Sequence, residues 1–492
     1  MKLTLPLHAL PLLGLAPCAF AQGLVFVAPP GETVLDTDST QVVTTTGTVT
    51  VTGGVFVFSS VTIPAGSTVR GRGSRPMIWV VDTMTVDGRL SVDGQKGTDV
   101  YTLASASFPA PGGVPGPAGG AGGSGSPQIA LQSLAGRSGN GPGNSPGLGG
   151  TGGLIAFPPA CLRGSGGGGG GFATNGDPWF KSGPGTGTGF AQRAGVGGFG
   201  CTGVSGSATR SLIGGGPGGV PFLDARPDND FFGLGYDVAS QTFVSGELQG
   251  LQGLVGGAGG GGGGDLSNDG LLLSPNWRLD EVAGGGGGGG GCLLVYAQQT
   301  IVVGPTGRIT ADGGNGGGGS AAASCWFAGG GGGGAGGLMI LAARVHVELH
   351  VKGETYANND YEFVLSADGG VTTTGTFGTP VVVAKYPANG QPTIPGTMYD
   401  SAPLGGFGGM GVVQLMTPAG TGNPDGTNTI LDDNIRVIRN GVLLGGAQKQ
   451  RFLAWRGYVN AAGVRVDDFG VPTNIQGNEG DIRPAPALLP LF

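Results

Sequence analysis

Apolar and polar residues alternate along several short stretches near the start of the chain. In residues 46–52 a threonine stands at every second position, so these threonines would share one strand face while Val49 and Val51 occupy the other. A period of two predicts strands, and turn residues such as Pro64 and Gly66 indicate where they end. Further short apolar runs that predict strands are residues 55–58, 61–63 and 77–81.

Glycine runs precede apolar stretches in the second half of the chain. The first two such stretches begin at Leu293 and Leu338, which are 45 residues apart. Repeated units at this kind of spacing stack so that each buries the face its neighbour exposes, which predicts a parallel β-solenoid. The runs are 284–291, 329–337 and 405–411, and the stretches that follow them are 293–295, 338–341 and 412–416.

A longer internal repeat supports the same prediction. Residues 76–97 resemble residues 292–316, because both contain an apolar strand, a second strand, a glycine turn, a short strand and a final glycine. The C-terminal region differs, since Asn440 and Gly441 stand between two apolar runs and predict a type I′ hairpin. We therefore expect an all-β protein with parallel β-solenoid-like repeats, polyglycine segments and an antiparallel C-terminal module. The alternative is a β-sandwich with disordered glycine loops.

Glycine and proline supply 113 and 34 of the 492 residues, so fibrous or disordered structure has to be considered. Collagen is excluded, because glycine occurs in contiguous runs and not at every third residue over a long stretch. Disorder of the whole chain is disfavoured, because only 11% of residues are charged and strand-like segments flank the runs. The runs themselves are either flexible loops or extended three-fold chains that pack through backbone hydrogen bonds.

The first residues predict export. Lys2 is followed by an apolar stretch and by small residues at Ala19 and Ala21, the order of a secretory signal peptide. A lipoprotein signal at Cys18 is the alternative, although Pro17 beside the cleaved bond fits that processing poorly. We expect a secreted or cell-surface protein without a transmembrane segment, because no later stretch reaches roughly 18 consecutive apolar residues. The predicted organisation is a signal peptide in 1–21, an N-terminal β region in 22–105, a glycine-rich region in 106–283, polyglycine and β repeats in 284–352 and a C-terminal β region in 353–492.

Cysteine usage also fits an exported protein. Four cysteines follow the predicted signal peptide, and an even number in such a chain favours disulfides over metal ligation. Free buried thiols are the alternative. The candidates are Cys161, Cys201, Cys292 and Cys325, and sequence proximity pairs the first with the second and the third with the fourth.

One group of residues has the composition of a metal site. His346, Glu348 and His350 would project from one face of a strand at intervals of about 7 Å, from a rise of about 3.3 Å per residue. Zinc or copper would need a bent strand or a further ligand, because each ligand lies about 2.0 Å from the ion. A solvated polar face opposite Val347 and Leu349 explains the alternation equally and is the competing interpretation.

Clustered acidic residues make calcium the one candidate cofactor; otherwise we expect none. Oxygen-rich loops of exported proteins can hold calcium, but no cluster matches a complete EF-hand, and turn-forming aspartates are a commoner cause. The clusters are Asp36 with Asp38, Asp228 with Asp230, and Asp425 with Asp432 and Asp433.

Catalytic motifs are absent or incomplete. Residues 143–147 match the nucleophile-elbow string around Ser145, but Pro146 lacks the N–H that would stabilise an oxyanion. A P-loop is excluded, because no lysine follows a glycine. The chain therefore favours a non-catalytic protein over an enzyme.

A resemblance agrees with these expectations. The order of residues 56–58, 63–66 and 86–90, the glycine runs, and then 307–316 resembles uncharacterised glycine-rich secreted bacterial proteins. This resemblance implies a β-helix-like exterior protein and no activity. In composition alone, the runs are similar to the polyglycine helices of phage tail-fibre adhesin tips and of a glycine-rich antifreeze protein.

We predict a secreted or cell-surface structural or adhesive protein. Its expected partners are extracellular polysaccharide or cell-envelope components, with self-association open. Nucleic acid is disfavoured, because the net charge is −7 and no block of lysine or arginine occurs. One alternative is an extracellular carbohydrate-binding or carbohydrate-cleaving β-helix. Another is an ice-binding protein, suggested by the threonine rows in 46–52 and 372–376.

Overall fold

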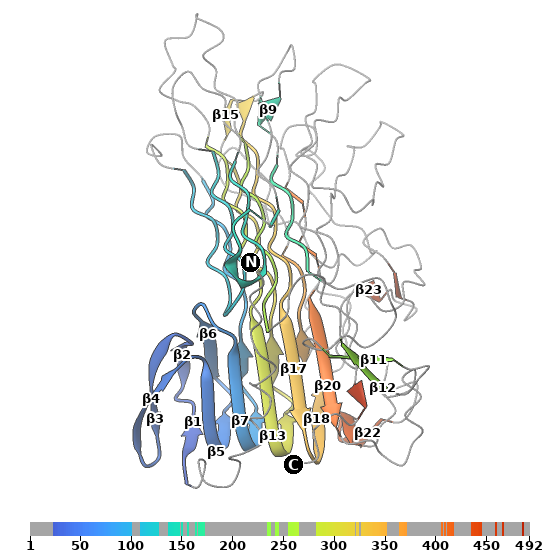
Figure 1. The fold of residues 1–492 in the computed structure, drawn as a ribbon. Coiled ribbons are helices and arrows are strands. Elements are labelled where there is room, and N and C mark those ends of the chain that lie inside the picture. The colour runs from blue at the N-terminus through green and yellow to red at the C-terminus, as the bar shows by residue number, and fades with distance from the viewer. Residues whose placement is uncertain are drawn as a thin grey trace, which may run out of the picture.

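The computed structural model has two levels (Figure 1). Strands form sheets at one end, and extended glycine-rich segments rise from them as a bundle toward the other end. The described part of the chain contains no α-helix and one turn of 3-10 helix at Pro142–Asn144. The described residues are 23–100, 109–126, 136–147, 149–150, 166–172, 254–264, 282–319, 328–351, 364–370, 405–406, 408–409, 411–417 and 434–444, with short strands outside these ranges whose bounds are given below.

The larger sheet has ten strands. They are β1 (Val25–Val27), β5 (Val55–Ile63), β7 (Met77–Val86), β13 (Cys292–Val303), β17 (Leu338–Ala343), β18 (His346–Val351), β20 (Val412–Thr417), β21 (Ile435–Arg439), β22 (Val442–Leu443) and β25 (Ala485–Pro486). The order is β1-β5-β7-β13-β17-β20-β25, and β18 pairs with both β13 and β21. All of these pairs are parallel except β21 with β22.

A smaller sheet packs against the larger one. Its five strands are β2 (Gly31–Asp36), β6 (Ser67–Arg72), β8 (Arg89–Ser91), β14 (Arg308–Thr310) and β19 (Leu365–Ser366). Their order is β19-β14-β8-β6-β2, and every pair is parallel. The predicted all-β class with mainly parallel pairing is confirmed.

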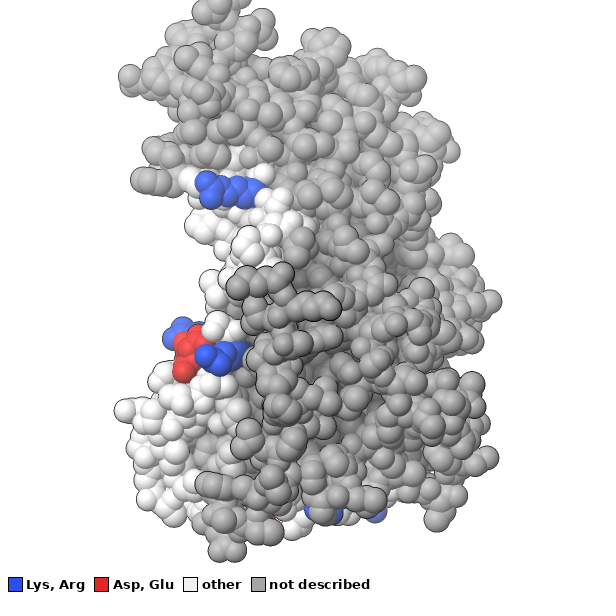
Figure 2. Space-filling view, in the orientation of Figure 1, with Lys and Arg blue, Asp and Glu red and all other residues white. Residues whose placement is uncertain are grey.

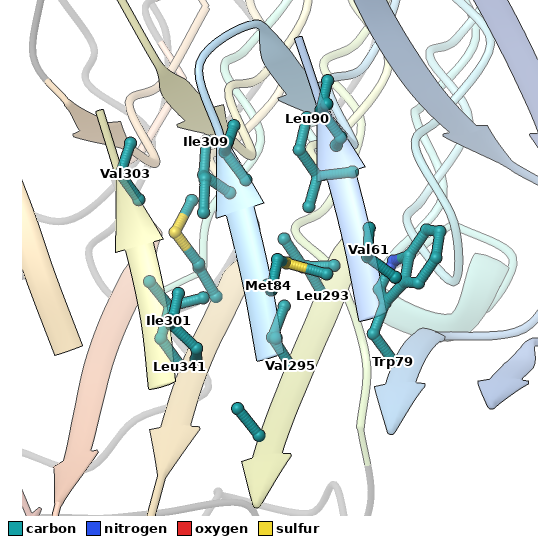
Figure 3. Close-up of a cluster of buried hydrophobic side chains, with 14 of the residues drawn as sticks. Val61, Trp79, Met84, Leu90, Leu293, Val295, Ile301, Val303, Ile309 and Leu341 are labelled. Carbon is teal, nitrogen blue, oxygen red and sulfur yellow. The ribbon is translucent and has the colours of Figure 1, made fainter. Parts of the chain in front are cut away.

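The chain alternates between the two sheets, because β5 leads into β6, β7 into β8 and β13 into β14. Alternate side chains of these strands point into one shared core between the sheets (Figure 3). Trp79 is fully buried there, and its ring stacks on Phe56 with 4.8 Å between ring centroids. Burial of such large apolar groups is the main favourable contribution in this part of the molecule.

The internal repeat corresponds to neighbouring strands. Met77 to Val86 is paired with Leu293 to Val303, and Arg89 with Arg308, so the two copies lie side by side in parallel register. The larger copy contains one extra residue between Ala297 and Thr300, where the register shifts. The similarity of 76–97 to 292–316 therefore reflects two adjacent units with the same inward-facing positions.

An antiparallel hairpin closes the N-terminal side of the core. It consists of β3 (Ser39–Thr44) and β4 (Gly47–Thr52). Val42 and Val51 are buried in the shared core, whereas the threonines at 48, 50 and 52 are exposed. The predicted alternation is confirmed from residue 47 onward, and Thr46 lies in the turn that precedes the strand.

The predicted type I′ hairpin is also present. Asn440 and Gly441 both have positive φ, 52° and 78°, as this turn requires. Its first strand, β21, pairs in parallel with β18, so the hairpin extends the larger sheet and does not form a separate unit.

Short strands complete the described structure. A four-stranded group has the order β15-β16-β10-β9, and Figure 1 places β15 and β9 at the end of the bundle remote from the sheets. Two further pairs, β11 with β12 and β23 with β24, are antiparallel. The bounds are β9 (Ile155–Ala156), β10 (Arg163–Gly164), β11 (Leu234–Asp237), β12 (Thr242–Ser245), β15 (Ala321–Ala323), β16 (Trp326–Phe327), β23 (Tyr458–Val459) and β24 (Arg465–Val466).

Candidate functional site

The bundle of glycine-rich segments above the sheets is here called the glycine lattice. Its segments are extended chains that bond through the backbone to several neighbours at once. It consists of the described residues of 92–100, 109–126, 136–141, 149–150, 166–172, 254–264, 282–291, 311–319, 328–337, 367–370 and 405–411.

The run 284–291 is enclosed by six neighbouring segments. Its successive N–H groups donate in rotation to three of them at 2.7–3.1 Å, and the rotation repeats every third residue. The carbonyls of 284–290 accept in the same rotation from three others. This period of three is that of a polyproline II helix. The accepting segments are 328–337, 92–100 and 118–126, and the donating segments are 254–264, 311–319 and 109–117.

The runs 259–264 and 329–334 are enclosed in the same manner. No side chain would fit between these chains, because a Cβ atom at Gly287 would collide with the carbonyl oxygen of Gly314. Of the two alternatives for the glycine runs, packed three-fold chains are therefore right and flexible loops are wrong for the described runs. As an example of the packing, segment 328–337 donates to 254–264, 311–319 and 405–411 and accepts from 282–291, 166–172 and 367–370.

Glycine content follows the position of each segment. The enclosed runs are glycine at every residue, whereas 92–100, which has lattice neighbours on one side, has only Gly94 and Gly97. Both of these face inward, because a Cβ atom at either would collide with a carbonyl of the run 284–291. The intermediate segment 313–317 has a single residue other than glycine. In segment 92–100 glycine therefore occurs at the positions where a neighbouring backbone approaches most closely.

The lattice continues the two sheets. Segments 92–100, 311–319 and 367–370 extend strands β8, β14 and β19 and keep their order, since the first bonds to the second and the second to the third. The order persists because hydrogen-bonded strands are already about 4.7–4.9 Å apart. The segments that continue the larger sheet are 282–291, 328–337 and 405–411, and those that lie outside them are 118–126, 254–264 and 166–172.

Side chains become smaller where the sheets pass into the lattice. Facing sheets are about 10 Å apart, and this distance must fall until backbones touch. Inward positions accordingly shrink from a large aliphatic residue to a small one and then to glycine within five residues. The three series are Leu90, Val92 and Gly94; Ile309, Ala311 and Gly313; and Leu365, Ala367 and Gly369.

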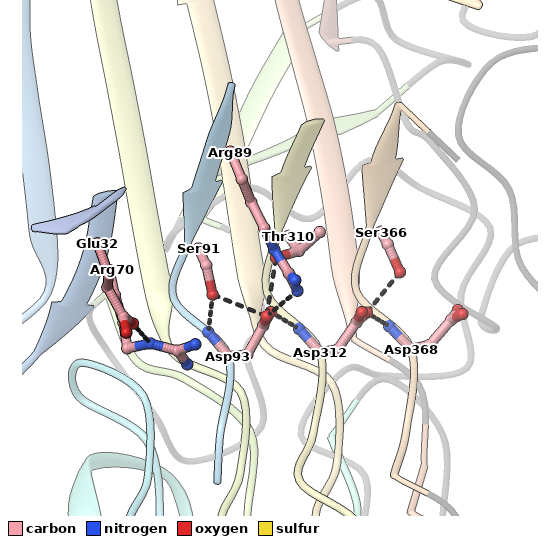
Figure 4. Close-up of polar contacts among 9 residues, drawn as sticks. All are labelled: Glu32, Arg70, Arg89, Ser91, Asp93, Thr310, Asp312, Ser366 and Asp368. Carbon is pink, nitrogen blue, oxygen red and sulfur yellow. Dashed lines mark hydrogen bonds and ion pairs between the residues drawn. The ribbon is translucent and has the colours of Figure 1, made fainter. Parts of the chain in front are cut away.

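Aspartates form a ladder at this junction (Figure 4). One carboxylate oxygen of Asp93 accepts hydrogen bonds from Ser91 Oγ at 2.7 Å and Thr310 Oγ1 at 2.9 Å, and Arg89 approaches it at 2.6 Å. Its other oxygen accepts from the N–H of Asp312 at 2.7 Å. Asp93 therefore joins β8 to β14 and also satisfies a backbone donor on the outer side of the next segment.

Two further aspartates, Asp312 and Asp99, link neighbouring segments in the same way. Asp312 accepts hydrogen bonds from Ser366 Oγ and from the N–H of Asp368, and Asp99 accepts from the N–H of Gly318 at 2.8 Å. Carboxylates of one segment thus cap N–H groups of the next. Sequence reasoning missed this feature, although the signal is a Ser/Thr-x-Asp-Gly pattern at 91–94, 310–313 and 366–369.

The predicted metal residues lie together on β18. His350 Nε2 is 2.8 Å from Glu348 Oε1, and Arg436 on β21 is 4.0 Å from the other oxygen of Glu348. Burial and the nearby Arg436 lower the pKa of His346, although Glu348 acts in the opposite direction. No group of three His, Cys, Asp or Glu side chains in the described residues has the arrangement to hold a metal. Metal binding by His346, Glu348 and His350 stays a prediction.

Other candidate residues have structural partners or lie outside the described part. Asp36 pairs with Arg72 at 3.5 Å, and Asp38 accepts a hydrogen bond from the N–H of Ser74 at 3.0 Å, as expected of turn aspartates. The remaining acidic clusters, at 228–230 and 425–433, lie outside the described residues. Calcium binding there stays a prediction.

Cys292 is buried, and this burial raises the pKa of its thiol far above the usual value. Cys161, Cys201 and Cys325 lie outside the described residues, so both disulfide pairings stay predictions. Ser145 lies in a turn that joins two lattice segments, where its carbonyl accepts from the N–H of Gly141. A nucleophile elbow needs a strand that leads into its turn, and the described residues just before this turn, 136–141, form no strand.

Comparison with protein-family models, with curated proteins and with solved structures gave no match. Among the residues that the structure describes, no helix is long and apolar enough to cross a membrane. The properties of the glycine lattice are therefore the basis for a functional proposal.

Proposed function

We propose that this chain is an exported structural or adhesive protein in which the glycine lattice acts as a rigid spacer. In this proposal the two sheets are stacked solenoid units that anchor the lattice. The alternation of β5, β7 and β13 between the sheets supports the solenoid interpretation. The signal-peptide pattern of residues 1–21 supports export.

The observation that carries the proposal is the enclosure of the run 284–291 on all sides by hydrogen-bonded neighbours. A glycine chain is normally the most flexible kind of chain, and here its N–H and carbonyl groups are engaged in rotation. At about 3.1 Å per residue, ten residues of such a chain reach about 30 Å. This length separates the remote end of the lattice from the sheets.

The remote end is where a contact surface would lie. The chain leaves the lattice there after residues 126 and 264 and re-enters at 136 and 282. The intervening sequences, 127–135 and 265–281, are poor in glycine and include apolar and aromatic residues such as Trp277. We propose that these connections contact the extracellular target, which is polysaccharide or a cell-envelope component.

The face of the lattice shown in Figure 2 suits a spacer better than a binding surface. On the face shown in Figure 2, the described charged side chains gather in a few places. Between the two upper groups the described surface is hollowed and uncharged. A surface with few charged or large side chains offers little for a partner to recognise.

Binding to intact cells and to isolated envelope polysaccharide tests the proposal. A variant in which 265–281 is replaced by a glycine-serine linker of equal length should keep its thermal stability and lose most binding. The matched control replaces exposed threonines of β4, at 48, 50 and 52, by serine, and should bind like the parent. Immunolabelling that finds the parent protein only inside cells, or undiminished binding by the linker variant, would refute the proposal.

A further inference from the structure

Segment 109–117 forms a flank of the glycine lattice that is bonded to protein on one side only. Gly113 and Gly116 donate inward to the run 284–291. The other side faces solvent, where Val114 is 53% exposed. A backbone edge of this kind resembles the edge strand of a sheet, which recruits further strands unless it is protected.

Prolines in this segment follow the lattice period of three. Positions 110, 113, 116 and 117 are buried, and only the last of them is proline. Three of the five other positions are proline, which has no N–H to offer a new neighbour. Of those five, only Gly112 and Val114 retain a donor, and no other described lattice segment contains proline. The three are Pro109, Pro111 and Pro115.

The flank is rich in acceptors where it is poor in donors. The carbonyls of Pro111 and Val114 accept from Thr98 and Gln95 of the adjacent segment. Among the described residues, the carbonyls at 109, 112 and 115 have no hydrogen-bond partner. A second chain that approached this flank would meet carbonyl groups and few N–H groups.

The neighbouring segment 92–100 protects its own outer side with charge. Every third residue is charged, namely Asp93, Lys96 and Asp99. The two aspartates also cap the N–H groups of Asp312 and Gly318, so those donors are not available to a new chain. Charged side chains and prolines are the two devices that commonly protect sheet edges, and both occur here on adjacent segments.

We propose that the flank formed by 109–117 is a closed edge that prevents a second copy of this chain from adding to the lattice. Two copies meeting flank to flank would place the carbonyls at 109, 112 and 115 opposite one another, with only the N–H groups of Gly112 and Val114 available to pair with them. The prolines therefore limit the lattice to the segments of one chain. Any self-association of the protein uses another surface, and the proposal is independent of the adhesive function.

Two double variants of the full chain test the closed edge. Pro111→Gly with Pro115→Gly and Pro111→Ala with Pro115→Ala each restore two N–H groups on the flank. Two flanks in a two-fold arrangement would then form up to four new hydrogen bonds, each worth roughly a factor of 2 to 10 in the equilibrium constant. In sedimentation velocity over a concentration series, both variants should self-associate at least about tenfold more tightly than the parent.

Three controls make the result specific. Pro29→Gly with Pro30→Gly changes two exposed prolines at the sheets and should sediment like the parent. Adding Val114→Lys to the alanine pair should restore the parent behaviour, because a charge then occupies the new interface. Circular dichroism identifies any variant that fails to fold, and the alanine pair is conclusive if the glycine pair unfolds.

Two results would overturn the proposal. One is that the folded alanine pair sediments like the parent at every concentration, which would mean that the prolines do not close the edge. The other is that the parent itself associates and Val114→Lys alone abolishes this association. The flank would then be an open interface between copies.

Discussion

The sheets and the glycine lattice share one chain spacing but are held together by different interactions. In the sheets, side chains such as Trp79 and Met84 fill the space between layers about 10 Å apart. In the lattice, layers are joined directly by backbone bonds such as that from Gly287 N–H to Gly332 O, at 2.8 Å. The sheets are therefore sensitive to lost side-chain volume, and the lattice is sensitive to added volume.

The comparison also indicates which region depends on the other. A net hydrogen bond contributes about 0.5–1.5 kcal/mol, whereas ordering one residue's backbone costs about 1–2 kcal/mol and most for glycine. The lattice by itself is therefore at best marginal. Anchoring by strands such as β13 and β17 at the end of each run supplies the missing stability, so we expect the lattice to unfold together with the sheets.

The largest expected effect is loss of volume in the sheets. Trp79→Ala should destabilise the protein by about 3–5 kcal/mol, because a large ring stacked on Phe56 is removed from a fully buried site. Denaturant unfolding followed by far-ultraviolet circular dichroism measures the loss. Val43→Ala, at an exposed position of β3, is the control, with an expected change below about 0.5 kcal/mol. A loss below about 1 kcal/mol for Trp79→Ala would contradict this account of the core.

Addition of one methyl group to the lattice should have the next largest effect. Gly287→Ala should cost about 2–3 kcal/mol, because its Cβ atom collides with the rigid carbonyl of Gly314. Gln95→Ala changes an exposed side chain of segment 92–100 and should alter stability by less than about 0.5 kcal/mol in the same assay. Equal stability of the Gly287 variant and the parent would show that the enclosed run is not packed in solution.

The aspartate ladder joins the two regions and should have a smaller effect. Asp93→Asn should destabilise the protein by about 1–2 kcal/mol, because the amide nitrogen replaces one carboxylate oxygen and cannot accept the hydrogen bond donated there, by Ser91 at one oxygen or by Asp312 at the other. Glu32→Gln removes a partly exposed ion pair with Arg70 and should cost less than about 1 kcal/mol. Thermal melts of both variants at neutral pH measure the difference between their losses of stability. Equal losses would contradict this account and show that the Asp93 carboxylate is bonded to water and not to the neighbouring segment.

The smallest expected effect is on pH dependence. Burial and Arg436 lower the pKa of His346, so the folded protein binds this proton less readily than the unfolded chain does. Stability is full above the unfolded pKa of about 6.5 and falls as pH drops through the lower folded value. His346→Gln should therefore flatten the decline of the melting temperature below about pH 6.5. An unchanged slope would show that His346 does not titrate with folding.

Local patterns in the sequence were enough to predict much of the sheet region. The alternation around Val49 and Val51, the Asn440 and Gly441 turn, and the repeat of 76–97 in 292–316 all encode which side chains face inward. Each depends on residues near one another in sequence or on two similar copies. Parallel pairing followed from that similarity.

The lattice and the ladder were harder to predict for a physical reason. An all-glycine run such as 284–291 carries no side chain to report which neighbours surround it, so flexible and packed chains look alike in sequence. The informative signal lay in its neighbours, where Gly94 and Gly97 recur at a spacing of three. The ladder was missed because Asp-Gly pairs such as Asp93 with Gly94 are typical of turns, and only their recurrence at three junctions distinguishes them.

The dependence of glycine content on position in the lattice has a consequence for insertions and deletions. Segment 92–100, which has lattice neighbours on one side only, must keep its register. Moving its sequence by one residue would turn Gln95 or Lys96 toward the run 284–291. Such a segment can change length only in steps of three residues. The enclosed run 284–291 does not depend on register, since it is glycine at every position and each register presents the same surface to its neighbours. Lengths that vary by single residues should therefore be tolerated at the centre of the lattice and selected against at its border.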